Sequence, residues 1–223
     1  MRFVMGLFVI GSVSLRAQAL DWSRDLPSQA RVIMAESAAV PAVEAAAVSG
    51  PATEQLKERL DGIFDLVRTP PADENEKERR LKKVRAMAGE LFHWGEMAKL
   101  TLGRHWDART ADEKAEFVAL FSELMERAYV SKIDLYGGEP IRFLGEEVQG
   151  EGSVVVKTVL ITRKKQHLPI HYVLKDMDGR WRAYDLSIEG ISLADNYRVQ
   201  FSRIIVKESF AQLLAKLRSK RIG

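Results

Sequence analysis

The chain has 223 residues, of which 46% are hydrophobic and 29% charged, and it carries a formal net charge of +3 and no cysteine. This length suits one domain of ordinary size, and the composition is that of a folded globular protein. The absence of cysteine excludes thiol catalysis, disulfide exchange and cysteine-based metal sites, and no apolar run reaches the roughly 18–20 residues that span a bilayer.

The first residues have the pattern of a secretory signal peptide. Arg2 supplies a positive charge, residues 3–15 are all apolar or small, and Ala17-Gln18-Ala19 has the small-x-small pattern of a cleavage site, although Arg16 beside it is atypical. A membrane anchor is the alternative, but about 13 residues are too few to span a bilayer. Removal of residues 1–19 lowers the net charge to +1. The net charge of the remaining chain therefore gives no reason to expect nucleic-acid binding.

A linker or N-terminal arm is expected at residues 20–52, because residues 35–52 are rich in alanine and contain two prolines. A single folded domain is expected from residue 53 to residue 223. Its first part has apolar residues at helical spacing in four stretches: 56–67, 81–92, 94–102 and 110–136. The longest stretch begins with a capping box formed by Thr110 and Glu113, and we expect it to end at Gly137-Gly138.

The pattern then changes to the period of two that is typical of strands. Strands are predicted at 141–148, 153–162, 168–176 and 180–188. Short turns at Gly150–Gly152 and Asp178-Gly179 join them into an antiparallel meander, and two more helices are predicted from Ser192 and Ser209. The order of helices, strands and helices predicts an α+β fold with helices packed on one face of a four-stranded antiparallel sheet.

The stretch at residues 184–201, YDLSIEGISLADNYRVQF, changes from strand to helix in its middle. The strand is expected to end at Ile188, and Gly190 permits a sharp change of direction. The following helix has Tyr197 and Phe201 on its inner face. We therefore expect it to fold back over the sheet and to close a cleft into a pocket.

Candidates for catalysis or metal binding are few. The four histidines do not have the spacing of a zinc site, and the sequence contains no nucleotide-binding loop and no nucleophile elbow. Asp185 could act as a buried base near the end of a strand. The alternative is that Asp185 caps a turn or pairs with Arg182 or Arg198.

The remaining signal is apolar surface on the strands and on the long helix. Stripes of this kind are typical of a filled core, and the same periodicity fits side chains that line a cavity. Both interpretations stay open on the pattern alone.

Three segments resemble the periplasmic toluene-tolerance family of lipid carriers, also called MlaC proteins. They are LFHWGEMAKLTLGRHW at 91–106, TADEKAEFVALFSELMERAYVSKIDLY at 110–136 and DGRWRAYDLSIEGISLADNYRVQFSRII at 178–205. The likeness extends from residue 53 to about residue 220, and the motifs agree in order and spacing. The alanine-rich arm is longer than the family pattern.

The resemblance implies a soluble periplasmic protein that is not an enzyme, and we expect a monomer because a shuttle has reason to be monomeric. Its cargo would be phospholipid, carried between an outer-membrane lipoprotein complex and an inner-membrane ABC transporter, with no cofactor, metal or nucleic acid. The implied fold packs helices against a strongly curved sheet and leaves an apolar pocket for acyl chains. Two alternatives stay open: a carrier of hopanoids or other polycyclic lipids, and a small pocket enzyme that uses Asp185 as its base.

Two sets of residues are expected to contact such a cargo. The acyl chains are expected against apolar residues of the long helix, the inner strand positions and the helix after Gly190: Phe117, Leu120, Phe121, Leu124, Met125, Tyr129, Phe143, Val156, Leu160, Ile170, Tyr172, Leu174, Ile188, Tyr197 and Phe201. The phosphate of the head group is expected near basic residues at the mouth: Arg163, Lys164, Lys165, Arg198 and Arg203.

Overall fold

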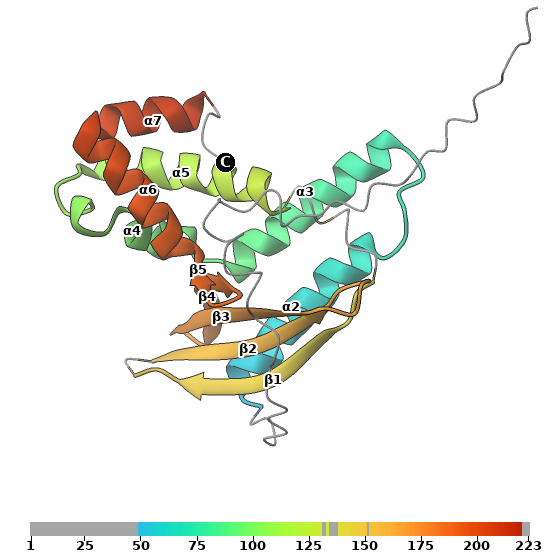
Figure 1. Ribbon diagram of the computed structural model, residues 1–223. Helices are drawn as coiled ribbons and strands as arrows, with labels where there is room; N and C mark the ends of the chain where they lie inside the picture. The colour runs from blue at the N-terminus through green and yellow to red at the C-terminus, as the bar shows by residue number, and fades with distance from the viewer. Residues whose placement is uncertain (1–48, 131–132, 134–137, 151, 220–223) are drawn as a thin grey trace, which may run out of the picture. The chain divides into compact units, whose positions relative to one another are not determined.

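A computed structural model describes residues 49–130, 133, 138–150 and 152–219, which all belong to one unit of the chain, Ala42–Gly223 (Figure 1). The expected signal peptide at 1–19 and most of the expected arm at 20–52 lie outside the described residues. In chain order the elements are α2 (Pro51–Val67), α3 (Glu74–Leu91), α4 (Trp94–Leu102), η2 (Gly103–His105), α5 (Ala111–Ala128), β1 (Ile141–Val148), β2 (Ser153–Ile161), β3 (His167–Met177), β4 (Arg180–Ile188), β5 (Ile191–Ser192), α6 (Leu193–Lys207) and α7 (Phe210–Arg218).

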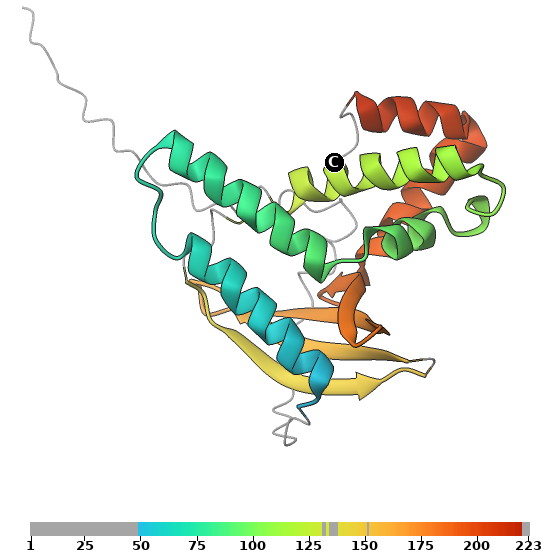
Figure 2. The same cartoon turned by 180° about the vertical axis from the view of Figure 1, so that it is seen from behind.

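The strands form one antiparallel sheet in the order β1-β2-β3-β4-β5. Helix α2 runs along one face of the strands, and α4 to α7 gather at the β4–β5 end (Figures 1 and 2). The predicted α+β fold is confirmed, and the predicted bounds of β1 and β4 agree with the structure.

The predicted number of four strands is wrong, because a fifth short strand follows β4. Glu189 and Gly190 both have positive φ angles, 53° and 80°, which is the backbone of a two-residue hairpin turn. The turn lets Ile191 pair with Ile188 before α6 begins. Glu189 lacks the intrinsic preference of asparagine or aspartate for such a turn, so the sequence pattern predicted a change of direction but not a hairpin.

Helix α5 begins where the capping box predicts and ends earlier than predicted. The N–H of Glu113 donates to Thr110 Oγ1 (3.2 Å), and the N–H of Thr110 donates to Glu113 Oε2 (2.9 Å). The helix ends at Ala128 instead of Gly137-Gly138, and Tyr136 lies outside the described residues. Tyr129 packs with the helices, whereas Val130 packs against the sheet. Because one straight helix cannot serve both cores, the helix ends at Ala128, just before these two residues.

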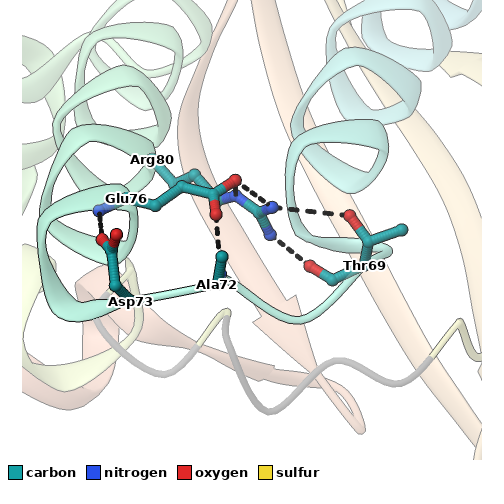
Figure 3. A network of polar contacts seen from close by, with 5 residues as sticks. All are labelled: Thr69, Ala72, Asp73, Glu76 and Arg80. Atoms are coloured by element: carbon teal, nitrogen blue, oxygen red, sulfur yellow. Dashed lines mark hydrogen bonds and ion pairs between the residues drawn. The ribbon is translucent and has the colours of Figure 1, made fainter.

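A network of polar contacts holds the connection between α2 and α3 (Figure 3). Arg80 on α3 donates to the carbonyl of Thr69 and to Glu76 Oε1 (3.1 Å from Arg80 Nε). The N–H of Ala72 donates to Glu76 Oε2 (2.6 Å), and this bond together with the Arg80 guanidinium lowers the pKa of Glu76. Asp73 caps α3 by accepting from the N–H of Glu76 (2.7 Å). The network fixes how the chain turns from one helix into the next.

The apolar interior is divided into two clusters. The helical cluster joins α4, α5, α6 and α7 and contains Met97, Ala98, Leu102, Phe117, Phe121, Leu124, Met125, Leu193, Tyr197, Phe201, Phe210, Leu213, Leu214 and Leu217. The sheet cluster joins α2, α3 and the strands and contains Ala52, Leu56, Leu60, Ile63, Val67, Val84, Leu91, Val154, Val156, Tyr172, Leu174 and Ala183. Leu186 on β4 is half-buried and packs against both clusters.

The β4–β5 turn generates a prediction about backbone strain. Gly190→Ala is expected to lower the free energy of unfolding by about 1–2 kcal/mol, because an L-residue at φ of 80° is strained. No atom lies within 4 Å of the added Cβ, so the backbone conformation alone causes the loss. Urea denaturation measures this change.

A second glycine provides the matched control. Gly89 lies inside α3, and a Cβ added there also meets no atom within 4 Å. Gly89→Ala is therefore expected to raise the free energy of unfolding by about 0.5–1 kcal/mol. Equal effects of the two substitutions would contradict the proposed conformation of the turn.

Candidate functional site

A hollow of about 450 Å³ opens between α2 and the start of β1. Its apolar lining comes from Leu60 and Phe64 on α2 and from Ile141 and Phe143 on β1. Leu60 is a buried member of the sheet cluster, and Phe64 and Phe143 are half-buried and pack against it. The floor of the hollow is therefore continuous with the sheet cluster.

The polar lining of the hollow consists largely of charges that are already paired. Lys57 forms an ion pair with Asp61, and Arg68 forms one with Asp65 at 2.9 Å. All four side chains are exposed. The rim is thus close to neutral and can remain hydrated, while the floor is apolar.

The inner face of the sheet supplies further members of the sheet cluster, to which Leu60 of the hollow belongs. Val156 on β2 pairs in register with Tyr172 on β3, which pairs with Leu186 on β4. Val156 and Leu174 are fully buried, and burial raises the pKa of the Tyr172 phenol above its ordinary value. A β-bulge at Leu144 interrupts β1 beside Phe143 and leaves Leu144 exposed.

The predicted residues on α5 and α6 form a separate aromatic group within the helical cluster. Phe117 and Phe201 meet edge to face with ring centroids 5.7 Å apart, and Phe121 meets Tyr197 in the same way at 6.0 Å. Tyr197 also shares a hydrogen bond with Tyr129, and burial raises the pKa of both phenols. These rings contact one another directly, as in a packed core.

The structure thus divides the residues predicted to contact acyl chains. Five belong to or pack against the sheet cluster: Phe143, Val156, Ile170, Tyr172 and Leu174. Eight belong to or pack against the helical cluster: Phe117, Leu120, Phe121, Leu124, Met125, Tyr129, Tyr197 and Phe201. Leu160 is half-buried and Ile188 buried, and neither is a member of the two clusters.

Sequence reasoning missed the contribution of α2 to the hollow. The spacing of Leu56, Leu60, Ile63 and Phe64 correctly predicted an amphipathic helix. The pattern carries no information on which helix faces which strand, so the acyl-chain residues were expected on the long helix, the strands and the helix after Gly190, and none on α2. In the structure α2 contacts β1, β2 and β4.

The basic residues predicted near the head group lie on different elements. Arg163, Lys164 and Lys165 are exposed in the β2–β3 connection, where Arg163 Nε donates to Glu139 Oε1 (2.7 Å). Arg198 and Arg203 lie on α6 and line a second hollow, between α6 and η2. The lining of the hollow at α2 and β1 contains none of these five residues.

Asp185 holds the start of α6 against β4. Its Oδ1 accepts from the N–H groups of Leu186 (2.8 Å) and Ala194 (3.0 Å), and its Oδ2 accepts from the hydroxyl of Ser192 (2.5 Å). Burial raises the pKa of Asp185 above its ordinary value, and the hydrogen bond from Ser192 opposes the rise. Both oxygens therefore have structural partners, which fits the predicted capping role.

Arg182 and Arg198, the predicted partners of Asp185, bind elsewhere. Arg182 donates to the carbonyl oxygens of Gly89 and Phe92, both at 2.6 Å. Arg198 pairs with Asp195 at 2.9 Å. Within the part of the chain that the structure describes, no cluster of acidic or histidine side chains could hold a metal ion, and no helix has the length and apolarity of a membrane span.

The family model described as MlaC protein matches residues 57–219. The chain belongs to the MlaC family. The match includes most of α2, the whole sheet, the whole helical cluster and the sheet cluster apart from Ala52 and Leu56.

Two known proteins are similar to this MlaC chain. One is the intermembrane phospholipid transport system binding protein MlaC of Haemophilus influenzae, 23% identical over 120 residues, which are 52% of this chain and 56% of that protein. The other is the solved structure of a phospholipid-binding protein from Ralstonia solanacearum in complex with a phospholipid. It has a TM-score of 0.65 and 18% identity, and the match covers 75% of this chain and 95% of that one. This likeness shows that the two proteins share a fold.

The contacts of Asp185 predict different effects for two substitutions. Asp185→Ala leaves the Ser192 hydroxyl and two N–H groups without their acceptor and is expected to lower the free energy of unfolding by about 2–3 kcal/mol. Asp185→Asn keeps an oxygen that can accept and is expected to cost less. Equal losses for both variants in urea denaturation would contradict the assigned contacts.

The pKa of Asp185 predicts how the Asn variant compares with the wild type as pH changes. Because folding raises this pKa above its ordinary value of 3.8, protonation of Asp185 stabilises the wild type. That stabilisation is complete below the unfolded pKa and is lost as pH rises through the raised folded pKa. The unfolding free energy of Asp185→Asn relative to wild type should therefore rise with pH in this window, and a fall would contradict the direction of the shift.

Proposed function

We propose that the protein is a periplasmic phospholipid carrier that shields acyl chains from water between α2 and the sheet. The observation that carries this proposal is the hollow of about 450 Å³, whose apolar floor continues into the sheet cluster. Its volume is within the range of roughly 300–1,000 Å³ of small-molecule sites. The names of the two similar proteins, a phospholipid transport binding protein and a phospholipid-binding protein, support the same cargo.

The energetics of transfer explain why a carrier needs such a space. Transfer of each CH₂ out of water is favourable by about 0.8 kcal/mol of free energy. Transfer of two bare acyl chains with about 30 such groups into water would therefore cost more than roughly 20 kcal/mol. A protein interior that resembles the bilayer removes most of this loss. Exchange with a membrane then becomes nearly neutral in free energy, and no catalytic group is required.

Of the five predicted residues of the sheet cluster, Phe143 lines the hollow. We place the acyl chains first against Phe143 and then against the other four, which belong to or pack against the same cluster. The rings of the helical cluster already contact one another, so a lipid would reach them only if those rings separated. The head group would stay at the hydrated rim, beside Lys57 and Arg68.

The proposed role includes the remaining steps that the family resemblance implies. A signal peptide at 1–19 would direct export to the periplasm. The monomeric carrier would exchange phospholipid between an outer-membrane lipoprotein complex and an inner-membrane ABC transporter. No cofactor other than the cargo is required.

The first test is direct identification of the cargo. The protein purified from the periplasm is extracted with organic solvent, and the extract is analysed by mass spectrometry. We expect phospholipid in the extract and uptake of labelled phospholipid from vesicles. An extract without phospholipid, combined with no uptake from vesicles, would refute the proposed function.

A second test separates the lipid space from the packed core. Phe143→Asp places a charge in the lining of the hollow and is expected to reduce bound phospholipid strongly, with a smaller loss of unfolding free energy than removal of a fully buried ring, because Phe143 is only half-buried. Phe201→Ala removes a fully buried ring of the helical cluster and is expected to lower the unfolding free energy by about 3–5 kcal/mol. The folded fraction of this variant should retain its phospholipid.

Mass spectrometry and urea denaturation of both variants give the readout. Loss of phospholipid from Phe201→Ala with retention by Phe143→Asp would place the cargo in the helical cluster instead.

A further inference from the structure

A second hollow, a groove of about 640 Å³, lies between the helix pair α4–η2 and α6. Its lining contains Leu102, Gly103, Arg104, His105, Arg198, Val199, Ser202, Arg203, Val206 and Lys207. None of these residues lines the hollow at α2 and β1. The groove is therefore a separate surface from the proposed cargo site.

The two walls of the groove meet closely at its floor. Leu102 is 1% exposed, and His105 Nε2 lies 3.1 Å from Ser202 Oγ across the groove. Gly103 has a φ of 49°, and a Cβ added there would lie 3.0 Å from Cδ of Arg198. The alkyl part of Arg198 thus packs on Gly103, and its charged end remains exposed.

The charge around the groove is positive and largely unbalanced. Arg104, Arg203 and Lys207 form no ion pair with the described residues, whereas Arg198 pairs with Asp195. No carboxylate belongs to the lining. This differs from the hollow at α2 and β1, where the cations are paired.

Apolar side chains stand beside these cations. Val199 and Val206 are 56% and 66% exposed and are seven residues apart on α6, so they lie on one stripe of the helix. A partner that covered both valines would remove their apolar surface from water, which is favourable. The groove therefore combines an apolar stripe with cations on both walls.

We propose that this groove docks an acidic amphipathic helix of a partner protein. The groove-lining part of α6, from Arg198 to Lys207, is about 15 Å long at 1.5 Å per residue, which is the length of nearly three helical turns. A helix with an apolar stripe and flanking carboxylates matches both the valines and the unpaired cations. A lipid surface fits less well, because a flat layer does not enter a groove whose floor is the buried Leu102. That this helix belongs to a protein on which a lipid carrier docks rests on the proposed function.

The test uses a synthetic helical peptide of about four turns with leucines along one stripe and glutamates on both sides. Its binding to the full chain is measured by fluorescence anisotropy. Arg203→Glu combined with Lys207→Glu is expected to weaken binding by about tenfold or more, because two attractions become repulsions. Val199→Ser combined with Val206→Ser is expected to weaken it without any change in charge.

Two controls distinguish the groove from general electrostatic attraction. Lys82→Glu combined with Lys83→Glu makes the same change in charge on the exposed face of α3 and should leave the affinity within about twofold. A scrambled peptide of the same composition lacks the apolar stripe and should bind weakly. No binding of the striped peptide, equal binding of the scrambled one, or an equal loss with the α3 variant would overturn the proposal.

The lipid alternative is tested with vesicles of phosphatidylcholine and phosphatidylglycerol. Binding of these vesicles through Arg203 and Lys207, without binding of the striped peptide, would assign the groove to a membrane surface and overturn the proposal. Bound phospholipid is measured by mass spectrometry in every variant. Peptide binding that fails while phospholipid remains bound would refute the docking groove and leave the proposed function intact.

Discussion

The apolar inner face of the sheet is the constraint on which the rest of the structure depends. Removal of that face from water gains roughly 25 cal/mol per Å², and a single layer of strands cannot bury its own face. Helix α2 provides much of the cover through Leu56, Leu60 and Ile63. Between α2 and the start of β1 the cover is incomplete, and the hollow lies there. The proposed cargo would complete the burial that the protein's own side chains leave unfinished.

The second cluster has a different origin and a different character. Asp185 and the Glu189-Gly190 turn set how α6 leaves β4, and α6 then packs with α4, α5 and α7. Edge-to-face contacts between aromatic rings fill this cluster. A packed aromatic core gives α6 a fixed place beside β4, whereas the sheet cluster continues into open space. The same apolar residue types thus serve as solid core in one place and as a wall in the other.

Local sequence signals predicted the elements well and their arrangement less well. Caps and turns depend on neighbouring residues, so Thr110, Gly190 and the bounds of β1 and β4 could be read from the chain. The pairing of α2 with the strands depends on contacts between residues far apart, which periodicity does not encode. For this reason the predicted acyl-chain residues contained Phe143, which lines the hollow, and Tyr172, which belongs to the sheet cluster, together with Phe117 and Phe201, which belong to the packed helical cluster. The early end of α5 has the same cause, since Tyr129 packs against the helical cluster and the next residue, Val130, packs against the sheet cluster.

The two hollows differ in the state of their charges, and this difference bears on what each can bind. At α2 and β1, Lys57 and Arg68 are neutralised by carboxylates of their own helix, so the rim would hold a hydrated head group without a strong preference for its charge. At α6 the cations Arg203 and Lys207 form no ion pair with any residue that the structure describes, which favours an anionic partner. The two apolar clusters meet at β4, because Asp185 binds the start of α6 and Leu186 beside it packs against both clusters. A partner docked on α6 would thus bind a helix that is anchored to the strand shared by the packed core and the sheet cluster.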